Sequence, residues 1–264
     1  MEWFESLYDD FRQRTGFGNL PEDRTRTDVD FLVEELSLKP GNRVLDLFSG
    51  TGRHSIELAR RGIEAVGVEL NSQYVGLAEQ KARETGVAPQ FITGDVRKVP
   101  FGSGYDAAII MWMSFGYFSD KDDCAVIRKV HSALKPGGRF LMELLNRDYL
   151  LHHFTPRDEK LIAGVKVVEE RTFDVLTSRI HGTICREDAG ETVTKEIHWR
   201  LYSPHELKNI LEGIGFRFVA AYGGLDRRRL DLETRLMRLV FEKECEQSHA
   251  ADALERAADV LGAC

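Results

Sequence analysis

The sequence predicts an α/β fold in which a doubly wound, mostly parallel sheet carries helices on both faces. Three observations favour this fold. Short apolar runs alternate with stretches of helical period between residues 43 and 145, a glycine-rich turn follows the first run, and residues 160–202 are β-rich without intervening helices. Alternation of strands and helices is typical of a parallel sheet. The β-rich stretch adds an antiparallel insert after the fifth strand.

Apolar side chains recur at helical spacing in two stretches before the first strand. They are Phe4, Tyr8 and Phe11, then Val29, Leu32, Val33 and Leu36. The first stretch predicts a helix over about residues 3–14, and the second predicts a helix that ends before the breaker at 39–41. The polar segment 15–27 between them is expected to be a loop. Residues 1–39 are therefore expected to form an N-terminal helical cover.

Five apolar runs predict the parallel strands. They lie at residues 43–47, 65–69, 90–92, 105–111 and 139–144. Helices are expected between them over about 54–61 and 72–84, and from about Asp120 onward. These elements form the first part of the core, residues 40–150.

The chain beyond residue 150 divides into an insert, the rest of the core and a tail. The insert, residues 151–202, contains three β-rich segments at 165–173, 179–186 and 192–201. Core elements resume at residue 203, where Ser203 as N-cap, Pro204 at the first helical position and Glu206 at the third indicate a capping box. Closing strands at 216–222 and 235–242 complete the core at residue 243, and residues 244–264 predict an amphipathic helical tail.

Composition and charge exclude several classes of protein. The 264 residues carry 36 Lys and Arg against 43 Asp and Glu, a net charge of −7, and such an acidic surface argues against nucleic-acid binding. No apolar run reaches the ~18 residues of a membrane-spanning helix, and the N-terminus lacks the pattern of a secretory signal. The four cysteines form no C-x-x-C pair, so we expect reduced thiols, a cytoplasmic location and no metal site.

The turn after the first strand is the most informative segment. Gly50 and Gly52 stand one residue apart between a buried strand and a helix, where a glycine-rich backbone can approach a ligand closely. A tight strand-to-helix connection is the alternative explanation. Glu69 ends the second strand, where an acidic side chain can bind both ribose hydroxyls of an adenosine. Both NAD and S-adenosylmethionine contain that group.

Two features favour S-adenosylmethionine over a dinucleotide. Ser55 replaces the third glycine of G-x-G-x-x-G, and Asp46 ends the first strand facing the ligand. A carboxylate there repels a pyrophosphate and attracts the sulfonium and ammonium groups of S-adenosylmethionine, by on the order of a few kcal/mol at an effective dielectric of ~20. Asp95 follows the third strand, where its side chain can accept from the adenine amino group and the Val96 backbone can reach a ring nitrogen. Three acids at successive strand ends therefore predict one site.

At these residues the chain resembles the class I S-adenosylmethionine-dependent methyltransferases. The matching motifs are VLDLFSGTGRHSIELARRG (44–62), AVGVELN (65–71), FITGDVRKVPF (91–101), YDAAIIMWMSFGYF (105–118) and LKPGGRFLMELLNR (134–147). The resemblance implies a Rossmann-like, seven-stranded sheet of order 3-2-1-4-5-7-6 with strand 7 antiparallel. It also implies which residues bind the cofactor, namely Asp46, Gly50, Gly52, Glu69, Asp95, Val96 and Met111. The lead-in helix and the β insert look like those of glycine/sarcosine and amino-sugar N-methyltransferases, in which case the insert is a substrate lid.

Candidate substrate-binding residues come from chain ends expected above the carboxyl edge of the sheet. They are Tyr8, Trp112, Ser114, Tyr117, Asn146, Arg147 and His153. Each has a structural alternative, such as core packing for Tyr8 and Trp112. His152 and His153 are candidate bases or a surface pair, Arg26 is a candidate partner of the cofactor carboxylate or a solvated loop residue, and Arg171 and Arg200 are candidate anion contacts or exposed strand charges. No catalytic motif is evident.

The sequence thus predicts a methyltransferase that acts on a small molecule, as a monomer or homodimer, with an amine nucleophile favoured over oxygen. This chemistry needs alignment of nucleophile, methyl and sulfur, and a neutral amine needs no strong base. The alternatives are an RNA or protein methyltransferase, an NAD-binding oxidoreductase, and a noncatalytic protein that binds the cofactor.

Overall fold

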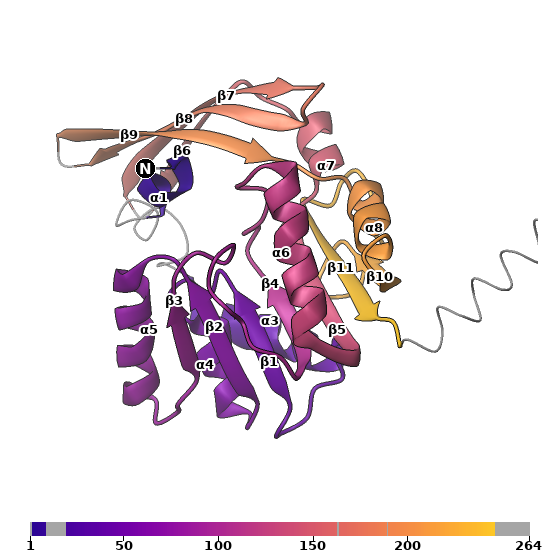
Figure 1. Cartoon of the computed structure of the whole chain (residues 1–264). Coiled ribbons are helices and arrows are strands. Elements are labelled where there is room, and N and C mark those ends of the chain that lie inside the picture. Colours follow the sequence, from indigo (N-terminus) through magenta and orange to yellow (C-terminus); the bar gives the residue numbers. More distant parts are fainter. Residues whose placement is uncertain (1, 9–19, 163, 189, 246–264) are drawn as a thin grey trace, which may run out of the picture.

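A seven-stranded sheet forms the centre of the protein in the computed structural model, which describes residues 2–8, 20–162, 164–188 and 190–245 (Figure 1). Its strands follow the order β10-β11-β5-β4-β1-β2-β3. Their bounds are β1 Arg43–Leu47, β2 Glu64–Glu69, β3 Gln90–Thr93, β4 Tyr105–Ile110, β5 Leu134–Leu145, β10 Phe216–Tyr222 and β11 Leu236–Lys243. The strands are parallel except β11, which is antiparallel to both neighbours. The predicted fold class and strand order are confirmed.

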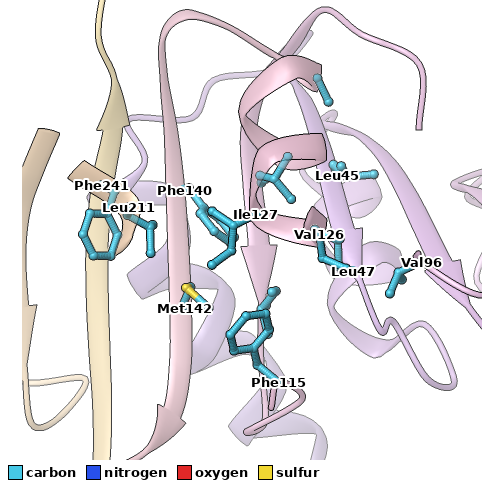
Figure 2. Packing of buried hydrophobic residues seen from close by; sticks show 14 of the residues in the cluster. Leu45, Leu47, Val96, Phe115, Val126, Ile127, Phe140, Met142, Leu211 and Phe241 are labelled. Atoms are coloured by element: carbon cyan, nitrogen blue, oxygen red, sulfur yellow. The ribbon is translucent and has the colours of Figure 1, made fainter. Parts of the chain in front are cut away.

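Helices cover both faces of this sheet. They are α3 Glu22–Glu35, α4 Arg53–Arg60, α5 Ser72–Glu84, α6 Asp120–Ala133 and α8 Pro204–Glu212. Because side chains alternate along a strand, Leu45 packs in the cluster that contains Val126 and Ile127 of α6, whereas Val44 packs with Leu32 of α3. Figure 2 shows the first of these layers. Two apolar layers therefore sandwich the sheet.

A second, antiparallel sheet follows β5. Its consecutive strands are β6 Arg157–Ile162, β7 Val165–Asp174, β8 Arg179–Asp188 and β9 Glu191–Arg200. Three of them correspond to the predicted β-rich segments, and β6 was not predicted because its sequence RDEKLI lacks an apolar alternation. The short helix α7, Arg147–His152, joins the two sheets and was not predicted either. The second sheet lies over one end of the core (Figure 1).

The N-terminal helices differ in extent from the prediction. Helix α1 spans Trp3–Leu7, is capped by Tyr8 and lies against β9 (Figure 1), while residues 9–14 of the predicted helix lie outside the described residues. Helix α3 begins at Glu22, so the prediction of a loop is wrong for residues 22–27. The apolar stripe of α3 begins only near Val29, and polar residues form its first turns, where the Thr27 hydroxyl donates to the Asp23 carbonyl at 2.9 Å.

The remaining expectations concern α8, the tail and membrane spans. Ser203 caps α8 in a capping box with Glu206 and Pro204 in the first turn, as predicted. The predicted tail helix lies outside the described residues. In the part of the chain that the structure describes, no helix is both long and apolar enough to cross a membrane.

Candidate cofactor site and a second cavity

A cavity of about 360 Å³ lies at the carboxyl ends of β1, β2, β3 and β4. Ten residues that the sequence singled out line it, namely Tyr8, Asp46, Gly50, Glu69, Asp95, Val96, Met111, Trp112, Ser114 and Tyr117. The carboxyl ends of parallel strands meet at one edge of a sheet, which is why acids far apart in sequence converge here. The three predicted acids share one cavity.

Asp46 is the most buried of these acids. It is the penultimate residue of β1 and is 1% exposed, and the Ser55 hydroxyl donates to its Oδ2 at 2.7 Å. Burial raises the pKa of Asp46 to about 7, against the lowering effect of the Ser55 bond and of the Arg53 charge. Ser55 therefore orients the carboxylate, which explains a serine where a dinucleotide fold has its third glycine.

Glu69 ties the glycine-rich turn to β2. Its Oε2 accepts from the Gly50 backbone N–H at 2.9 Å, and its Oε1 accepts from the Asn71 N–H at 2.8 Å. Burial raises the pKa of Glu69 although these bonds favour the charged form. The carboxylate thus already receives two donors at the cavity wall.

The two glycines of the turn have different surroundings. Gly50 lines the cavity with φ +56°, and a Cβ there would meet no atom within 4 Å. Gly52 does not line the cavity; it precedes α4 with φ +73°, and a Cβ there would lie 2.7 Å from Phe91 Cζ and 2.8 Å from the Ala78 Cβ. The structure therefore explains Gly52 by packing of the turn against Phe91 and α5.

Asp95 is paired with Arg97 at the far end of the cavity. The Arg97 guanidinium donates to both Asp95 oxygens at 2.7–3.0 Å and reaches Glu2 Oε1 at 2.7 Å. Burial opposes ionisation of Asp95, but the bonds from Arg97 dominate and lower its pKa. Arg97 also lies 4.2 Å above the Phe118 ring. One cation therefore joins the third acid to the segment that leads into α1.

Arg53 lines the cavity and was not singled out from the sequence. Its Nη1 donates to Asp28 at 2.8 Å and Thr25 at 3.1 Å, while its buried Nη2 has no hydrogen-bond partner among the described residues. Burial by itself raises the pKa of the Asp28 carboxyl, but the hydrogen bonds from His54 and Arg53 outweigh burial and lower this pKa. Arg26, the sequence candidate for such a cation, pairs with Asp23 at 3.5 Å and does not line the cavity. The position of Arg53 directly after the glycine turn is the signal that could have indicated it.

The backbone after β4 is strained next to the cavity. Trp112 and Met113 are consecutive non-glycine residues with φ of +59° and +62°. The Met113 N–H donates to the Glu143 carbonyl at 2.9 Å, which holds this turn against β5. Such strain concentrates at functional sites. It directs Trp112 into the first cavity and Met113 into a second one.

The second cavity, of about 370 Å³, lies under the inner face of the antiparallel sheet. Among the described residues only Tyr8 and Tyr117 line both cavities, and their hydroxyls are 2.6 Å apart. Of the other sequence candidates, His153 lines the second cavity and Trp112 and Ser114 line the first. The two tyrosines therefore stand between two spaces of similar size.

Side chains at alternate positions of the insert form the roof of the second cavity. Two ion pairs lie there, Glu169 with Arg171 at 3.2 Å and Asp158 with Lys160. The Trp199 indole N–H donates to the Phe115 carbonyl at 2.6 Å and so fixes β9 to the turn after β4. The sequence singled out Arg171 of this cavity lining, but not Asp158, Lys160 or Glu169.

Comparisons with known proteins agree with this geometry. Residues 44–138 match the family model described as "Methyltransferase domain". The glycine/sarcosine N-methyltransferase of Halorhodospira halochloris is 24% identical over 229 residues, which cover 84% of this chain and 83% of that protein. Residues 44–138 therefore form a methyltransferase domain, and the chain is an S-adenosylmethionine-dependent methyltransferase.

Two solved structures share the fold of this methyltransferase. An S-adenosylmethionine-dependent methyltransferase from Clostridium acetobutylicum has a TM-score of 0.75 at 18% identity and covers 92% of this chain and 98% of its own. S-adenosylmethionine-bound CalS10, an amino pentose methyltransferase from Micromonospora echinaspora, has a TM-score of 0.65 at 18% identity, with coverage of 92% and 97%. The cofactor of the methyltransferase is S-adenosylmethionine.

Asn146 and Arg147 do not reach either cavity of the methyltransferase. Asn146 is 2% exposed, and its Nδ2 donates to the carbonyls of Asp231 at 2.8 Å and Thr234 at 2.9 Å. Arg147 pairs with Asp148 and, at 3.1 Å, with Glu206. Their place directly after β5 suggested substrate contact, but both side chains are used to join α7 to its neighbours.

Arg171 and Arg200 are not the exposed strand charges that one sequence alternative expected. Arg171 lines the second cavity but is ion-paired, whereas Arg200 is 7% exposed and pairs with Glu206 at 2.7 Å and Asp120 at 3.4 Å. Neither is an exposed strand charge, and Arg200 serves the junction between the insert and the core.

Proposed function

We propose that the methyltransferase moves a methyl group from S-adenosylmethionine in the first cavity to an amine of a small molecule in the second. The observation that carries this proposal is the junction of the two cavities at Tyr8 and Tyr117, whose hydroxyls are 2.6 Å apart. A methyl transfer needs donor and acceptor in line and separated from water. Two cavities that adjoin at Tyr8 and Tyr117 satisfy this requirement.

The first cavity suits the charges of the cofactor. Asp46, which Ser55 orients, suits the cationic methionine end, and the unpartnered Nη2 of Arg53 suits its carboxylate. Glu69 suits the ribose hydroxyls, and Asp95 with Val96 suits the adenine. When bound, the cofactor supplies an electrophilic methyl carbon on a sulfonium.

The junction suits an amine acceptor. Both tyrosine hydroxyls can accept a hydrogen bond from the acceptor N–H and so direct the nitrogen lone pair toward the first cavity. Trp199 lies near Tyr117, with ring centroids 6.4 Å apart, and such rings stabilise the ammonium formed by transfer. As the N–CH₃ bond forms and the C–S bond breaks, the nitrogen becomes cationic and then loses a proton to water. Among the described residues, no basic side chain lines both cavities. A neutral amine does not require such a base.

The relatives support the same choice of acceptor. One compared protein is named an N-methyltransferase and another an amino pentose methyltransferase. The second cavity, of about 370 Å³, is as large as the first, of about 360 Å³, so the acceptor can approach the cofactor in size. The insert is then an acceptor lid, as the sequence suggested.

Transfer of radiolabelled methyl groups tests the proposal. A panel of amines matched with the corresponding alcohols and carboxylates, plus tRNA and a protein mixture, should show label on amines. Tyr117→Phe should lower kcat about tenfold or more while cofactor affinity stays within about twofold, because it removes an orienting group from the junction only. Tyr222→Phe is the matched control, since Tyr222 lines neither cavity. Label on tRNA or protein alone, or on alcohols alone, would overturn the amine assignment.

A further inference from the structure

Three side chains with metal-binding groups meet at the rim of the second cavity. His152 is the last residue of α7, His153 is its C-cap, and Glu233 lies in the turn before β11. His152 Nε2 lies 3.6 Å from Glu233 Oε1, and His153 Nε2 lies 3.4 Å from Glu233 Oε2. One ligand atom from each residue lies within 4.8 Å of the other two. His153 also lines the cavity itself.

The hydrogen bond of His153 determines which of its nitrogens faces the cluster. Its Nδ1 lies 3.0 Å from the Tyr149 carbonyl oxygen, and a carbonyl can only accept, so Nδ1 carries the proton. In the neutral ring Nε2 then presents a lone pair to a carboxylate oxygen that also has only lone pairs. A cation between these two acceptors removes their repulsion. A backbone bond at the other nitrogen is the arrangement that orients metal-binding histidines.

The two segments that carry the cluster are held together independently of it. The Asn146 side chain caps α7 and donates to the carbonyls of Asp231 and Thr234, while the Asn146 N–H donates to the Arg235 carbonyl at 2.9 Å. The Tyr149 ring stacks on His153 with centroids 4.3 Å apart. The ligand groups are therefore brought together before any ion binds.

We propose that His152, His153 and Glu233 bind a divalent transition-metal ion of the zinc type. Two imidazoles and one carboxylate suit zinc and disfavour magnesium or calcium, which prefer oxygen ligands. Tetrahedral zinc with ligands at ~2.0–2.1 Å separates them by roughly 3.3 Å. Each histidine Nε2 lies 3.4–3.6 Å from a different oxygen of Glu233, and one ligand atom from each residue lies within 4.8 Å of the other two, so small side-chain rotations bring all three onto one ion. Water completes the fourth position. The ion adds positive charge next to His153 in the lining of the second cavity, and its binding is a property separate from methyl transfer.

Isothermal titration of tag-free, chelator-treated full-length protein with ZnCl₂ tests the site. We expect one zinc per chain, and each of His152→Ala, His153→Ala and Glu233→Gln should weaken binding about tenfold or more. These side chains are 56%, 40% and 70% exposed, so the variants should fold. Cobalt(II) should give the visible bands of a tetrahedral site with the wild type and lose them with His153→Ala.

Two control variants separate this site from other histidines. His205 is an exposed histidine of α8, and His198 faces His181 at 3.0 Å between ring nitrogens on β8 and β9. His205→Ala and His198→Ala should both keep the wild-type zinc affinity. Absence of zinc binding, binding that survives Glu233→Gln and His153→Ala unchanged, or loss of binding in His198→Ala would overturn the proposal. Methyl transfer is not measured, so failure of this site leaves the proposed function standing.

Discussion

The pH dependence of cofactor binding should report the ionisation of Asp46. Burial raises the pKa of this carboxyl to about 7, and a cationic ligand is attracted only by the charged form. Protonation therefore weakens binding as the pH falls. If the cofactor binds only the ionised form, the apparent Kd is the intrinsic one multiplied by 1 + 10^(pKa − pH), which makes it about tenfold weaker at pH 6 than at pH 8. Burial lowers the pKa of His54 to about 4, so that neighbour does not titrate in this window.

Isothermal titration with S-adenosylmethionine at pH 6, 7 and 8 measures this effect. Repeating the pH 6 titration in buffers of different ionisation enthalpy should show that binding releases close to one proton. Asp46→Asn removes the titrating group, so the variant should bind S-adenosylmethionine weakly, with a Kd that is nearly independent of pH. Any pH dependence that remains in the variant belongs to the cofactor's own amino group or to Glu69. If the variant keeps the wild-type affinity and the wild-type slope, Asp46 does not face the cofactor and the reasoning fails.

Three further predictions concern stability. Gly52→Ala forces a Cβ into the 2.7 Å contact described above and should lower the free energy of unfolding by about 2–4 kcal/mol, against about 1 kcal/mol for Gly50→Ala, measured by urea denaturation; equal losses would contradict the packing role. Asn146→Ala leaves two carbonyls without donors and should lose about 2–3 kcal/mol without changing cofactor Kd. Arg238→Met leaves Glu143, which is 0% exposed and 2.5 Å from Arg238, as an unpaired buried charge. The free energy of unfolding should fall by about 3–5 kcal/mol. The double variant with Glu143→Leu should recover most of this loss, and no recovery would argue against the buried pair.

The elements that could be predicted from the sequence are those with a strong local signal. Strand β1 spans the predicted residues 43–47 and helix α5 the predicted 72–84, because apolar alternation and helical period are complete within each segment. Helix α8 begins at its predicted capping box. Strand β6 and helix α7 carry no such pattern. Their stability comes from the neighbours β7 and the 231–235 turn, which a local pattern does not contain.

The residues of the candidate site also divide into those that the sequence predicted and those that depend on contacts in the folded chain. Asp46, Glu69 and Asp95 were predicted together because each lies at or just after the carboxyl end of a strand, and the parallel topology alone brings these ends to one edge. Position after a strand was not enough for Asn146, whose amide caps α7 and joins the 231–234 turn. Arg53 was missed because its importance depends on Asp28, a residue of α3 that fixes one guanidinium nitrogen and leaves the other at the cavity.

The acceptor side depends on contacts that only the folded chain provides. Tyr8 and Tyr117 are 109 residues apart, and their hydroxyl contact exists because α1 is held between the two sheets. On one side Arg97 pairs with both Asp95 and Glu2, and on the other Trp3 donates to the Tyr117 carbonyl at 3.3 Å. The same short helix therefore borders both cavities, with Phe4 and Glu5 lining the first and Trp3 and Leu7 the second. Because both cavities share α1, we expect cofactor and acceptor to change each other's affinity by the same factor, which titration of each ligand in the presence and absence of the other measures.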